Sequence, residues 1–393
     1  MKALPVLATL LILGACASPT PAIVTRAIAA EQANALPLTP FYDTPDLSGS
    51  EPGDLLRQEE GTGYDLPDGV KAQRIMYHSL DASGADVATS AVVLIPRGKA
   101  PKSGWPVIAW AHGTSGVARM CAPSLMQDVY YGDEGLFPMV KAGYAVVATD
   151  YHGLGTVGPH QYSNRAAQTN DVIYSVPAAR QAVRSLGTRW VVDGHSQGGV
   201  AAWGVNQAEY ARSDPGFLGA VSVAGTVQGD EFARHLAAGE STGFYLAFMA
   251  AGINSLHPDF DPASMLTPAA MERYPQASSQ GCVYRAFAIY ADVESPAKPG
   301  WTDIPEVRSF FAELTPPQDP LAAPMLVIAG GHDSTVPVSG VREAVADACA
   351  AGQPVTLRVY PDLDHDPTMT ESTPFQLRWI ADRFADKPPQ PTC

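Results

Sequence analysis

The chain has 393 residues, a formal net charge of −15, 46% hydrophobic residues and 17% charged residues. These values are typical of a globular protein with one large core, or one core that carries an inserted cap. The negative charge excludes nucleic acid and anionic lipid surfaces as electrostatically attracted partners, because both need a basic protein surface. Neutral substrates fit this charge better.

The first residues have the pattern of an export signal. The stretch MKALPVLATLLILGACAS, residues 1–18, has one lysine, a short apolar run and then small residues, and it is too short for a membrane span. We expect a signal peptide over residues 1–15. The sequence LGAC at residues 13–16 resembles the lipobox of bacterial lipoproteins, in which Cys16 is lipidated and anchors the protein to the cell envelope. Ordinary cleavage, giving a periplasmic or secreted protein, is the alternative.

Residues 16–38 are rich in Ala, Pro and Thr and show no hydrophobic period, so they predict a tether. Two strand-like runs at residues 70–81 and 86–98 then predict a hairpin. After the hairpin, buried strands alternate with helices. The predicted strands cover residues 105–113, 144–155, 190–194, 218–225, 324–333 and 354–361, and the predicted helices cover residues 136–143, 171–187, 198–212, 338–350 and about 372–386. This alternation predicts an α/β fold, with a mostly parallel sheet and helices on both faces.

The alternation is interrupted from residue 226 to residue 318, where helix-like apolar stretches mix with proline-rich turns. We interpret this segment as an inserted, mainly helical cap, so that residues 39–225 and 319–393 form the core. One apolar helix of the cap, over residues 241–256, carries a stripe of large side chains: Phe244, Tyr245, Phe248 and Met249. Such a stripe is typical of a cap core, and its alternative use is a wall for an acyl chain.

Four cysteines remain after Cys16. An even number in an oxidising compartment predicts two disulfides, for which four cysteines allow three pairings. Cys393, at the chain end, is expected to hold the last segment onto Cys349, which leaves Cys121 to pair with Cys282. Free buried thiols are the alternative.

The stretch WVVDGHSQGGVAAW, residues 190–203, places one serine among glycines. A plain strand-to-helix turn would use such glycines for backbone angles that other residues resist. The pattern Gly194-x-Ser196-x-Gly198 also fits a nucleophile elbow, which holds a serine hydroxyl at the apex of a strained turn. Alone, the pentapeptide is weak evidence, so the choice depends on partner residues elsewhere.

Two candidate partners follow later strands in the order of α/β-hydrolases, in which the acid comes after the nucleophile and the histidine comes last. Asp333 follows the strand predicted at 324–333, and His365 follows the strand predicted at 354–361. The carboxyl ends of parallel strands meet at one edge of a sheet, so both loops should converge on Ser196. We expect His365 to take the proton of Ser196 and Asp333 to orient the imidazole.

An oxyanion hole needs two backbone donors. The N–H of Gln197, directly after the nucleophile, is expected to supply one at a helix N-terminus. The sequence HGTS at residues 112–115 stands where the HG-type hole motif is expected, which makes Thr114 the second donor and Ser115 its alternative.

Three aspartates lie within three residues of His365 and resemble a metal-binding cluster: Asp362, Asp364 and Asp366. No His or Cys spacing supports a metal there, so we expect solvated loop carboxylates. The sequence predicts neither a metal nor another cofactor.

Several stretches together resemble the secretory lipase family, the α/β-hydrolases similar to Candida antarctica lipase A, with this chain as a bacterial member. They are FYDTPDLSGSEPGDLLRQE (41–59), AHGTSGVARMCAPS (111–124), DYHGLG (150–155), GHSQGG (194–199) and GGHDSTVP (330–337). The resemblance implies an α/β-hydrolase fold, a Ser-Asp-His lipase or esterase, and a helical lid between the sixth and seventh strands. It also supports the disulfides Cys121–Cys282 and Cys349–Cys393. The yeast members carry an acidic residue where this chain has HGTS, so the choice of Thr114 rests on the HG-type position alone.

These features predict a serine carboxylic-ester hydrolase that cleaves neutral esters with short to medium acyl chains through an acyl-enzyme. A peptidase or amidase on the same scaffold is one alternative, because a catalytic triad of Ser196, His365 and Asp333 can expel either an amine or an alcohol. A non-catalytic binding lipoprotein is the other, although such proteins usually lose a triad member. Contact with a membrane is expected only through a lipid anchor on Cys16.

Overall fold

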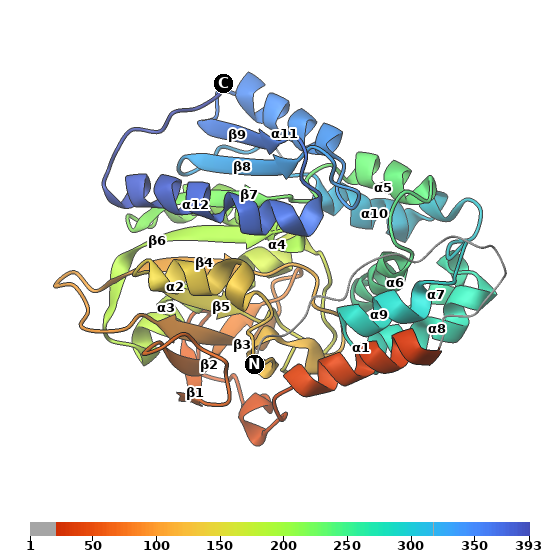
Figure 1. Cartoon of the computed structure of the whole chain (residues 1–393), viewed down its shortest axis with the longest axis horizontal. Helices are drawn as coiled ribbons and strands as arrows, with labels where there is room; N and C mark the ends of the chain where they lie inside the picture. The colour runs from red at the N-terminus through yellow and green to blue at the C-terminus, as the bar shows by residue number, and fades with distance from the viewer. Residues whose placement is uncertain (1–20, 317) are drawn as a thin grey trace, which may run out of the picture.

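The computed structural model describes residues 21–316 and 318–393, so the expected signal peptide and Cys16 lie outside the described residues. A nine-stranded sheet in the order β1-β2-β3-β5-β4-β6-β7-β8-β9 forms its centre (Figure 1). The strands are β1 (Leu55–Gly61), β2 (Lys71–Leu80), β3 (Asp86–Ile95), β4 (Trp105–Ala111), β5 (Ala145–Thr149), β6 (Leu186–His195), β7 (Phe217–Val223), β8 (Met325–Gly330) and β9 (Val355–Tyr360). Strands β1, β2, β3 and β5 pair antiparallel, and all pairs from β5 to β9 are parallel.

Helices cover both faces of the sheet. They are α2 (Phe137–Lys141), α3 (Arg165–Ala182), α4 (Gln197–Arg212), α11 (Val338–Ala350) and α12 (His365–Phe384). Alternate residues of a strand point to opposite faces. In β4, Val107 and Ala109 pack in the cluster with α3, α4 and α11, whereas Ile108 and Trp110 pack in the cluster with α2 and α12. The predicted mostly parallel sheet with helices on both faces is therefore confirmed.

Strand β1 was not predicted from the sequence. Its residues LLRQEEG include four charged or amide side chains, and it lies at the edge of the sheet, where it pairs only with β2. An edge strand with polar side chains lacks the hydrophobic run that marks the buried strands. Because β1 precedes the hairpin, the break in the alternation falls between the seventh and eighth strands.

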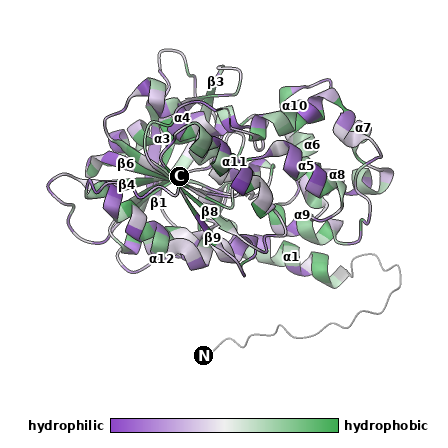
Figure 2. Cartoon of the chain, turned by 90° about the horizontal axis from the view of Figure 1, so that it is seen from above, coloured by the Kyte–Doolittle hydropathy of each residue, from purple (hydrophilic) through white to green (hydrophobic). Residues whose placement is uncertain are grey.

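The segment between β7 and β8 contains helices: α5 (Gly229–Ala237), α6 (Phe244–Leu256), α7 (Pro262–Met265), α8 (Pro268–Ser279), α9 (Val283–Tyr290) and α10 (Pro305–Leu314). They lie together beyond one end of the strands (Figure 1). Phe248 of α6 is fully buried in a hydrophobic cluster formed by these helices, and Phe244 is buried there too. In Figure 2 the helices carry both hydrophobic and hydrophilic residues, as expected of helices that cover a core.

Part of the segment predicted as a tether forms helix α1 (Pro21–Asn34), which runs alongside α9 (Figure 1). Its end is fixed to the core, where the side chain of Asn34 donates to Oδ1 of Asp128 at 2.9 Å and the N–H of Leu36 donates to the carbonyl of Leu125 at 2.7 Å. Tertiary contacts thus stabilise a helix whose sequence shows no clear hydrophobic period.

The last helix also begins earlier than predicted. We expected a start near residue 372, but α12 begins at His365 with Asp364 as its N-cap. Prolines are tolerated in the first turn of a helix, where no N–H partner is lost, and Pro367 lies there. Pro367 is therefore compatible with a helix that begins at His365.

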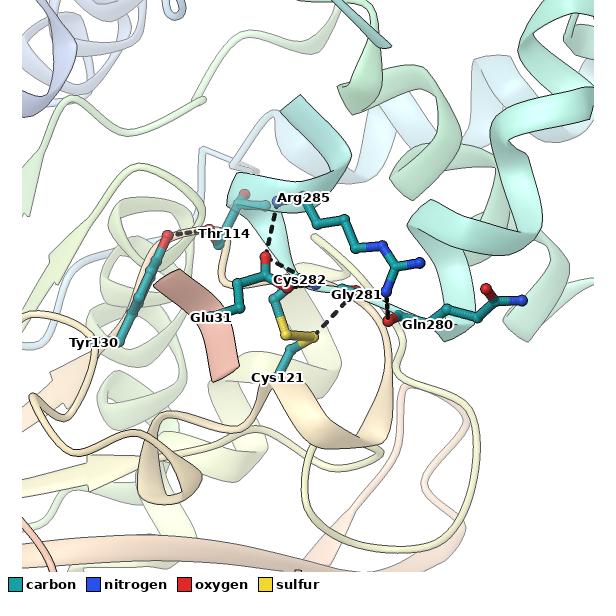
Figure 3. The surroundings of a disulfide bond; sticks show 8 residues. All are labelled: Glu31, Thr114, Cys121, Tyr130, Gln280, Gly281, Cys282 and Arg285. Carbon is teal, nitrogen blue, oxygen red and sulfur yellow. Dashed lines mark hydrogen bonds between the residues drawn. A yellow bond between two sulfur atoms is a disulfide. The ribbon is translucent and has the colours of Figure 1, made fainter. Parts of the chain in front are cut away.

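Two disulfides are present, between Cys121 and Cys282 and between Cys349 and Cys393, the same pairs that the sequence analysis expected. The first joins the loop after β4 to the start of α9 (Figure 3). The second joins α11 to the chain end. Within residues 21–316 and 318–393, no helix is long and apolar enough to cross a membrane.

Candidate active site

Ser196 occupies a sharp turn between β6 and α4. Its φ of 56° is positive, which is strained for a residue other than glycine. A Cβ on Gly198 would lie 1.9 Å from the carbonyl oxygen of Ala111, and one on Gly194 would lie 2.2 Å from the carbonyl oxygen of Gly198. No side chain fits at either glycine, so both residues allow the turn that presents the serine.

Ser196, His365 and Asp333 come together at the carboxyl ends of the parallel strands. The Oγ of Ser196 lies 2.8 Å from Nε2 of His365, and Nδ1 of His365 lies 2.8 Å from Oδ2 of Asp333. All three side chains are buried. An ionised carboxylate only accepts hydrogen bonds, so the proton of a neutral His365 lies on Nδ1 and Nε2 is left to accept from the serine hydroxyl.

Asp333 is held in one orientation by the backbone. Its Oδ1 accepts hydrogen bonds from the N–H groups of Thr335 and Val336, at 2.9 and 2.7 Å. Burial opposes protonation of His365, but the hydrogen bond and charge of Asp333, together with the charges of Asp366 and Asp364, outweigh it and raise the pKa of His365 above its ordinary value. The pair is therefore suited to stabilise an imidazolium ion.

The neighbouring aspartates differ in role from one another. Asp364, predicted as a solvated loop carboxylate, caps α12: its side chain accepts from the N–H of His365 and from the N–H of Ser334, each at 2.8 Å. Asp362, Asp364 and Asp366 are all exposed, as the sequence analysis expects of solvated carboxylates. Asp364 thus fixes His365 at the helix start, a contribution that the sequence analysis did not anticipate.

The expected oxyanion residues lie beside the serine. Gln197 is the first residue of α4, so its N–H is at a helix N-terminus. The Oγ1 of Thr114 lies 3.3 Å from Oε1 of Gln197 and 2.8 Å from the hydroxyl of Tyr162. The carbonyl of Thr114 accepts a hydrogen bond from the hydroxyl of Tyr130. These bonds hold the loop after β4 against the start of α4.

Ser196, Thr114 and Gln197 line a pocket whose other wall comes from the helices between β7 and β8, including Tyr245 and Met249 of α6. Two residues of the predicted apolar stripe therefore line the pocket that contains Ser196, while Phe244 and Phe248 pack only in the helical cluster. The pocket has a volume of about 10 Å³, which is room for roughly one water molecule. An acyl chain does not fit this conformation.

His195 lies between Tyr131 and the backbone of His365. Its Nδ1 lies 2.7 Å from the hydroxyl of Tyr131, and its Nε2 lies 3.4 Å from the carbonyl oxygen of His365. Burial and then the charge of His365 keep the pKa of His195 well below its ordinary value, so the ring is neutral. A carbonyl only accepts, so Nε2 carries the proton and Nδ1 accepts from Tyr131. The sequence gives no sign of this contact, because Tyr131 lies in a distant segment.

A single group of possible metal ligands occurs among the described residues, formed by His195, His365 and Asp366, with ligand atoms within 4.8 Å of one another. Both histidines already use their ring nitrogens in the hydrogen bonds above. The ring nitrogens that a metal would need are thus engaged in hydrogen bonds within the protein.

Residues 127–391 match the family model described as secretory lipase. The chain belongs to the secretory lipase family. This confirms the resemblance found in the sequence, and membership of a secretory family implies export.

Solved structures show the same fold. Candida antarctica lipase A in its closed state is 18% identical, with a TM-score of 0.75 over 91% of this chain and 89% of that one. A variant of the rice cell wall degrading esterase LipA from Xanthomonas oryzae is 19% identical, with a TM-score of 0.69 over 85% of this chain and 100% of that one. The chain is therefore an α/β-hydrolase in fold.

A protein of Mycobacterium tuberculosis named probable inactive lipase MT1628 is 26% identical over 379 residues, which cover 89% of this chain and 82% of that protein. The name of this relative describes it as inactive. Whether this member is an enzyme depends on its own site.

Proposed function

We propose that this member of the secretory lipase family is an active serine carboxylic-ester hydrolase that forms an acyl-enzyme on Ser196. The observation that carries the proposal is the unbroken series of hydrogen bonds from Ser196 to His365 to Asp333, each 2.8 Å long. A serine hydroxyl is a weak nucleophile unless a base removes its proton during attack, and His365 has the position and tautomer for that task.

In the proposed reaction the Oγ of Ser196 attacks the ester carbonyl while its proton passes to Nε2 of His365. The imidazolium is stabilised by Asp333 and then donates this proton to the leaving alcohol. Water, activated by the same nitrogen, attacks the acyl-enzyme and releases the carboxylic acid. The N–H of Gln197 and that of Thr114, or of Ser115, would bind the oxyanion in both tetrahedral states.

We propose neutral esters with short to medium acyl chains as substrates. The apolar wall supplied by Met249, Phe310 and Leu314 beside the serine supports this class, because burial of each CH₂ contributes about 0.8 kcal/mol. The net charge of −15 also disfavours anionic substrates. The volume of the pocket requires that side chains of the helices between β7 and β8 move to admit an acyl chain. We accordingly propose that residues 226–318 act as a cap on a core formed by residues 39–225 and 319–393.

Two other functions make different predictions. A peptidase or amidase would use the same three residues on an amide, and a non-catalytic binding protein would use none of them. The non-catalytic alternative needs a test because the Mycobacterium tuberculosis relative is named as inactive. The complete hydrogen-bonded series in this chain supports catalysis over binding alone.

The test compares the wild type with Ser196→Ala and His365→Ala on p-nitrophenyl esters of increasing acyl chain length. We expect each variant to lose roughly 10⁴-fold or more in kcat, because members of such a series act as a unit. The p-nitroanilides of the same acyl groups serve as amide substrates, and faster turnover of these than of the esters would identify an amidase. Wild-type turnover in Ser196→Ala, or no ester turnover in the wild type, would overturn the proposal.

We further propose that Cys16, which lies outside the described residues, is lipidated after removal of residues 1–15. Labelling of the cells with palmitate is expected to mark the wild type and not Cys16→Ser. Absence of label from the wild type would instead indicate ordinary cleavage and release.

A further inference from the structure

A second, larger pocket lies between α1, α9 and the chain segment around residues 120–130. Its volume is about 690 Å³, which falls in the range of small-molecule sites. Figure 3 shows its neighbourhood, where Glu31 of α1, Tyr130 and the disulfide Cys121–Cys282 surround the start of α9. This pocket has room for a ligand, in contrast to the closed pocket at Ser196.

The walls of the larger pocket are fixed to one another. The carboxylate of Glu31 accepts hydrogen bonds from the backbone N–H groups of Cys282, at 3.1 Å, and Arg285, at 2.8 Å. Asn34 at the end of α1 donates to Asp128 at 2.9 Å. The pocket is therefore largely preformed, which lowers the cost of ordering it on binding.

Adjacent residues of one loop line the two pockets. Thr114 lines the pocket that contains Ser196, and Ser115 lines the larger pocket. Tyr130 also lines the larger pocket, and its hydroxyl donates to the carbonyl of Thr114. The larger pocket thus begins one residue away from the expected oxyanion donor.

The lining suits a neutral, mostly apolar group. Ile28, Leu125 and Val283 are among the apolar side chains that contribute to it. The Oγ of Ser115 is buried, and no hydrogen-bond partner for it occurs among the described residues. A buried hydroxyl without a partner is costly, and a ligand oxygen would relieve that cost.

The charges of the lining exclude an anion. Three carboxylates, those of Glu31, Asp65 and Asp128, line the pocket, against the guanidinium of Arg285. A ligand with a carboxylate or phosphate would be repelled, and this includes the fatty acid product of ester hydrolysis. The acyl chain is therefore a poorer candidate for this pocket than the alcohol.

We propose that the pocket between α1 and α9 binds the alcohol part of the ester substrate, and that it prefers neutral aromatic or alkyl alcohols with an oxygen placed near Ser115. The proposal rests on the ester hydrolase function proposed above. It assigns the acyl chain to the pocket between Ser196 and α6, and the alcohol to the pocket on the other side of the Thr114–Ser115 loop.

The test uses esters that share one acyl group and differ in the alcohol, namely ethyl acetate and 2-naphthyl acetate. Both give the same acetyl-enzyme, so a later hydrolysis step is common to them. Ala33 is exposed on α1 and lines the pocket, so Ala33→Trp should fill the pocket and leave the fold intact. We expect kcat/KM for 2-naphthyl acetate to fall about tenfold or more, through KM, while kcat/KM for ethyl acetate changes less than about twofold.

The matched control is Ala29→Trp, the same substitution at an exposed position of the same helix that is not among the lining residues. This variant should have the same kcat/KM as the wild type for both esters. Ala30→Trp, at a second exposed lining position, should repeat the effect of Ala33→Trp. Equal losses on both esters, or no loss on either, in both lining variants would overturn the assignment of the pocket. A wild type that hydrolyses neither ester would instead overturn the proposed function.

An independent test compares 4-acetoxybenzoate with 4-acetoxybenzamide. The alcohol part of the first ester carries a carboxylate, and that of the second carries a neutral amide in its place. We expect kcat/KM of the wild type to be about tenfold higher for the neutral ester. Asp65 is exposed and lines the pocket, so Asp65→Asn should narrow this preference. No preference in the wild type, or one that Asp65→Asn leaves unchanged, would contradict the pocket's part in alcohol selection.

Discussion

The carboxylate of Glu31 in α1 caps the start of α9 through the backbone N–H of Arg285, with 2.8 Å between Oε1 and the nitrogen. The same carboxylate accepts from the N–H of Cys282, and the next residue, Val283, donates its N–H to the carbonyl of Ser115 at 2.9 Å. A negative charge at a helix N-terminus is stabilising. Helix α1 is thereby linked, through α9, to the loop beside Ser196.

Replacement of Glu31 by Ala should lower the free energy of unfolding by about 1 kcal/mol, because α9 loses the acceptor for its first N–H groups. Glu31→Gln keeps an acceptor oxygen without the charge and should lose less. Urea denaturation measures both effects. Glu294→Gln, which removes a charge at an exposed position, is the control. Equal losses for Glu31→Ala and Glu294→Gln would mean that the cap contributes no stability.

The positions of Ser196, Asp333 and His365 could be predicted because each follows a buried strand, and parallel strands bring the residues after them to one edge. The contacts around them could not be predicted in the same way. Tyr131, Tyr130 and Tyr162 reach the site from segments that are distant in sequence and lack a regular pattern. Their hydroxyls bond to His195, to the carbonyl of Thr114 and to its Oγ1.

Helix α1 and the first turns of α12 show a second limit. Both are specified by contacts or caps rather than by hydrophobic period: α1 by its bonds to residues 125–128 and α9, and α12 by Asp364. Local sequence favours a tether in the first case and a loop in the second. Tertiary structure overrides such weak preferences.

The pH dependence of ester hydrolysis should reflect His365. Only the neutral imidazole can accept the proton of Ser196, and the pKa of His365 is raised above its ordinary value of about 6.5. Activity should therefore be full at alkaline pH and fall as the pH drops through this raised pKa. In Asp333→Asn the burial effect remains without the carboxylate, so the acidic limb should move to lower pH.

Profiles of kcat/KM from about pH 5 to about pH 9 measure this shift in the wild type and in Asp333→Asn. The variant should also lose roughly 10⁴-fold in kcat, as expected when the orienting carboxylate is removed. An acidic limb at the same pH in both proteins would show that Asp333 does not set the pKa of His365.

The two disulfides should differ in their effect on activity. Cys121–Cys282 closes a loop with a sequence separation of 161, and Cys349–Cys393 one of 44. Loss of either, by substitution of both cysteines with serine, should cost roughly 2–4 kcal/mol of stability. Only the first links the loop that contains Thr114 to α9, so only its loss should lower kcat in protein kept well below its unfolding temperature. Equal effects of both double variants on kcat would contradict this link.

Asp193, in β6 just before the elbow, is fully buried, and no side chain hydrogen-bonds to its carboxyl group among the described residues. Burial raises the pKa of Asp193 well above its ordinary range, and the N–H of Gly194 offsets this only in part. In the unfolded chain the group loses its proton above about pH 3.9. The folded state holds the proton to higher pH, so stability should fall as the pH rises from about 4 toward the pKa of the folded state.

Asp193→Asn does not titrate and should escape this loss. The variant should gain stability relative to the wild type as the pH rises, by up to about 1.4 kcal/mol per pH unit. Urea denaturation at about pH 4 and about pH 7 measures the difference, and Asp259→Asn at an exposed position is the control. A difference between wild type and Asp193→Asn that is the same at both pH values would show that the carboxyl group is charged in the folded protein, with its cost offset by partners such as buried water.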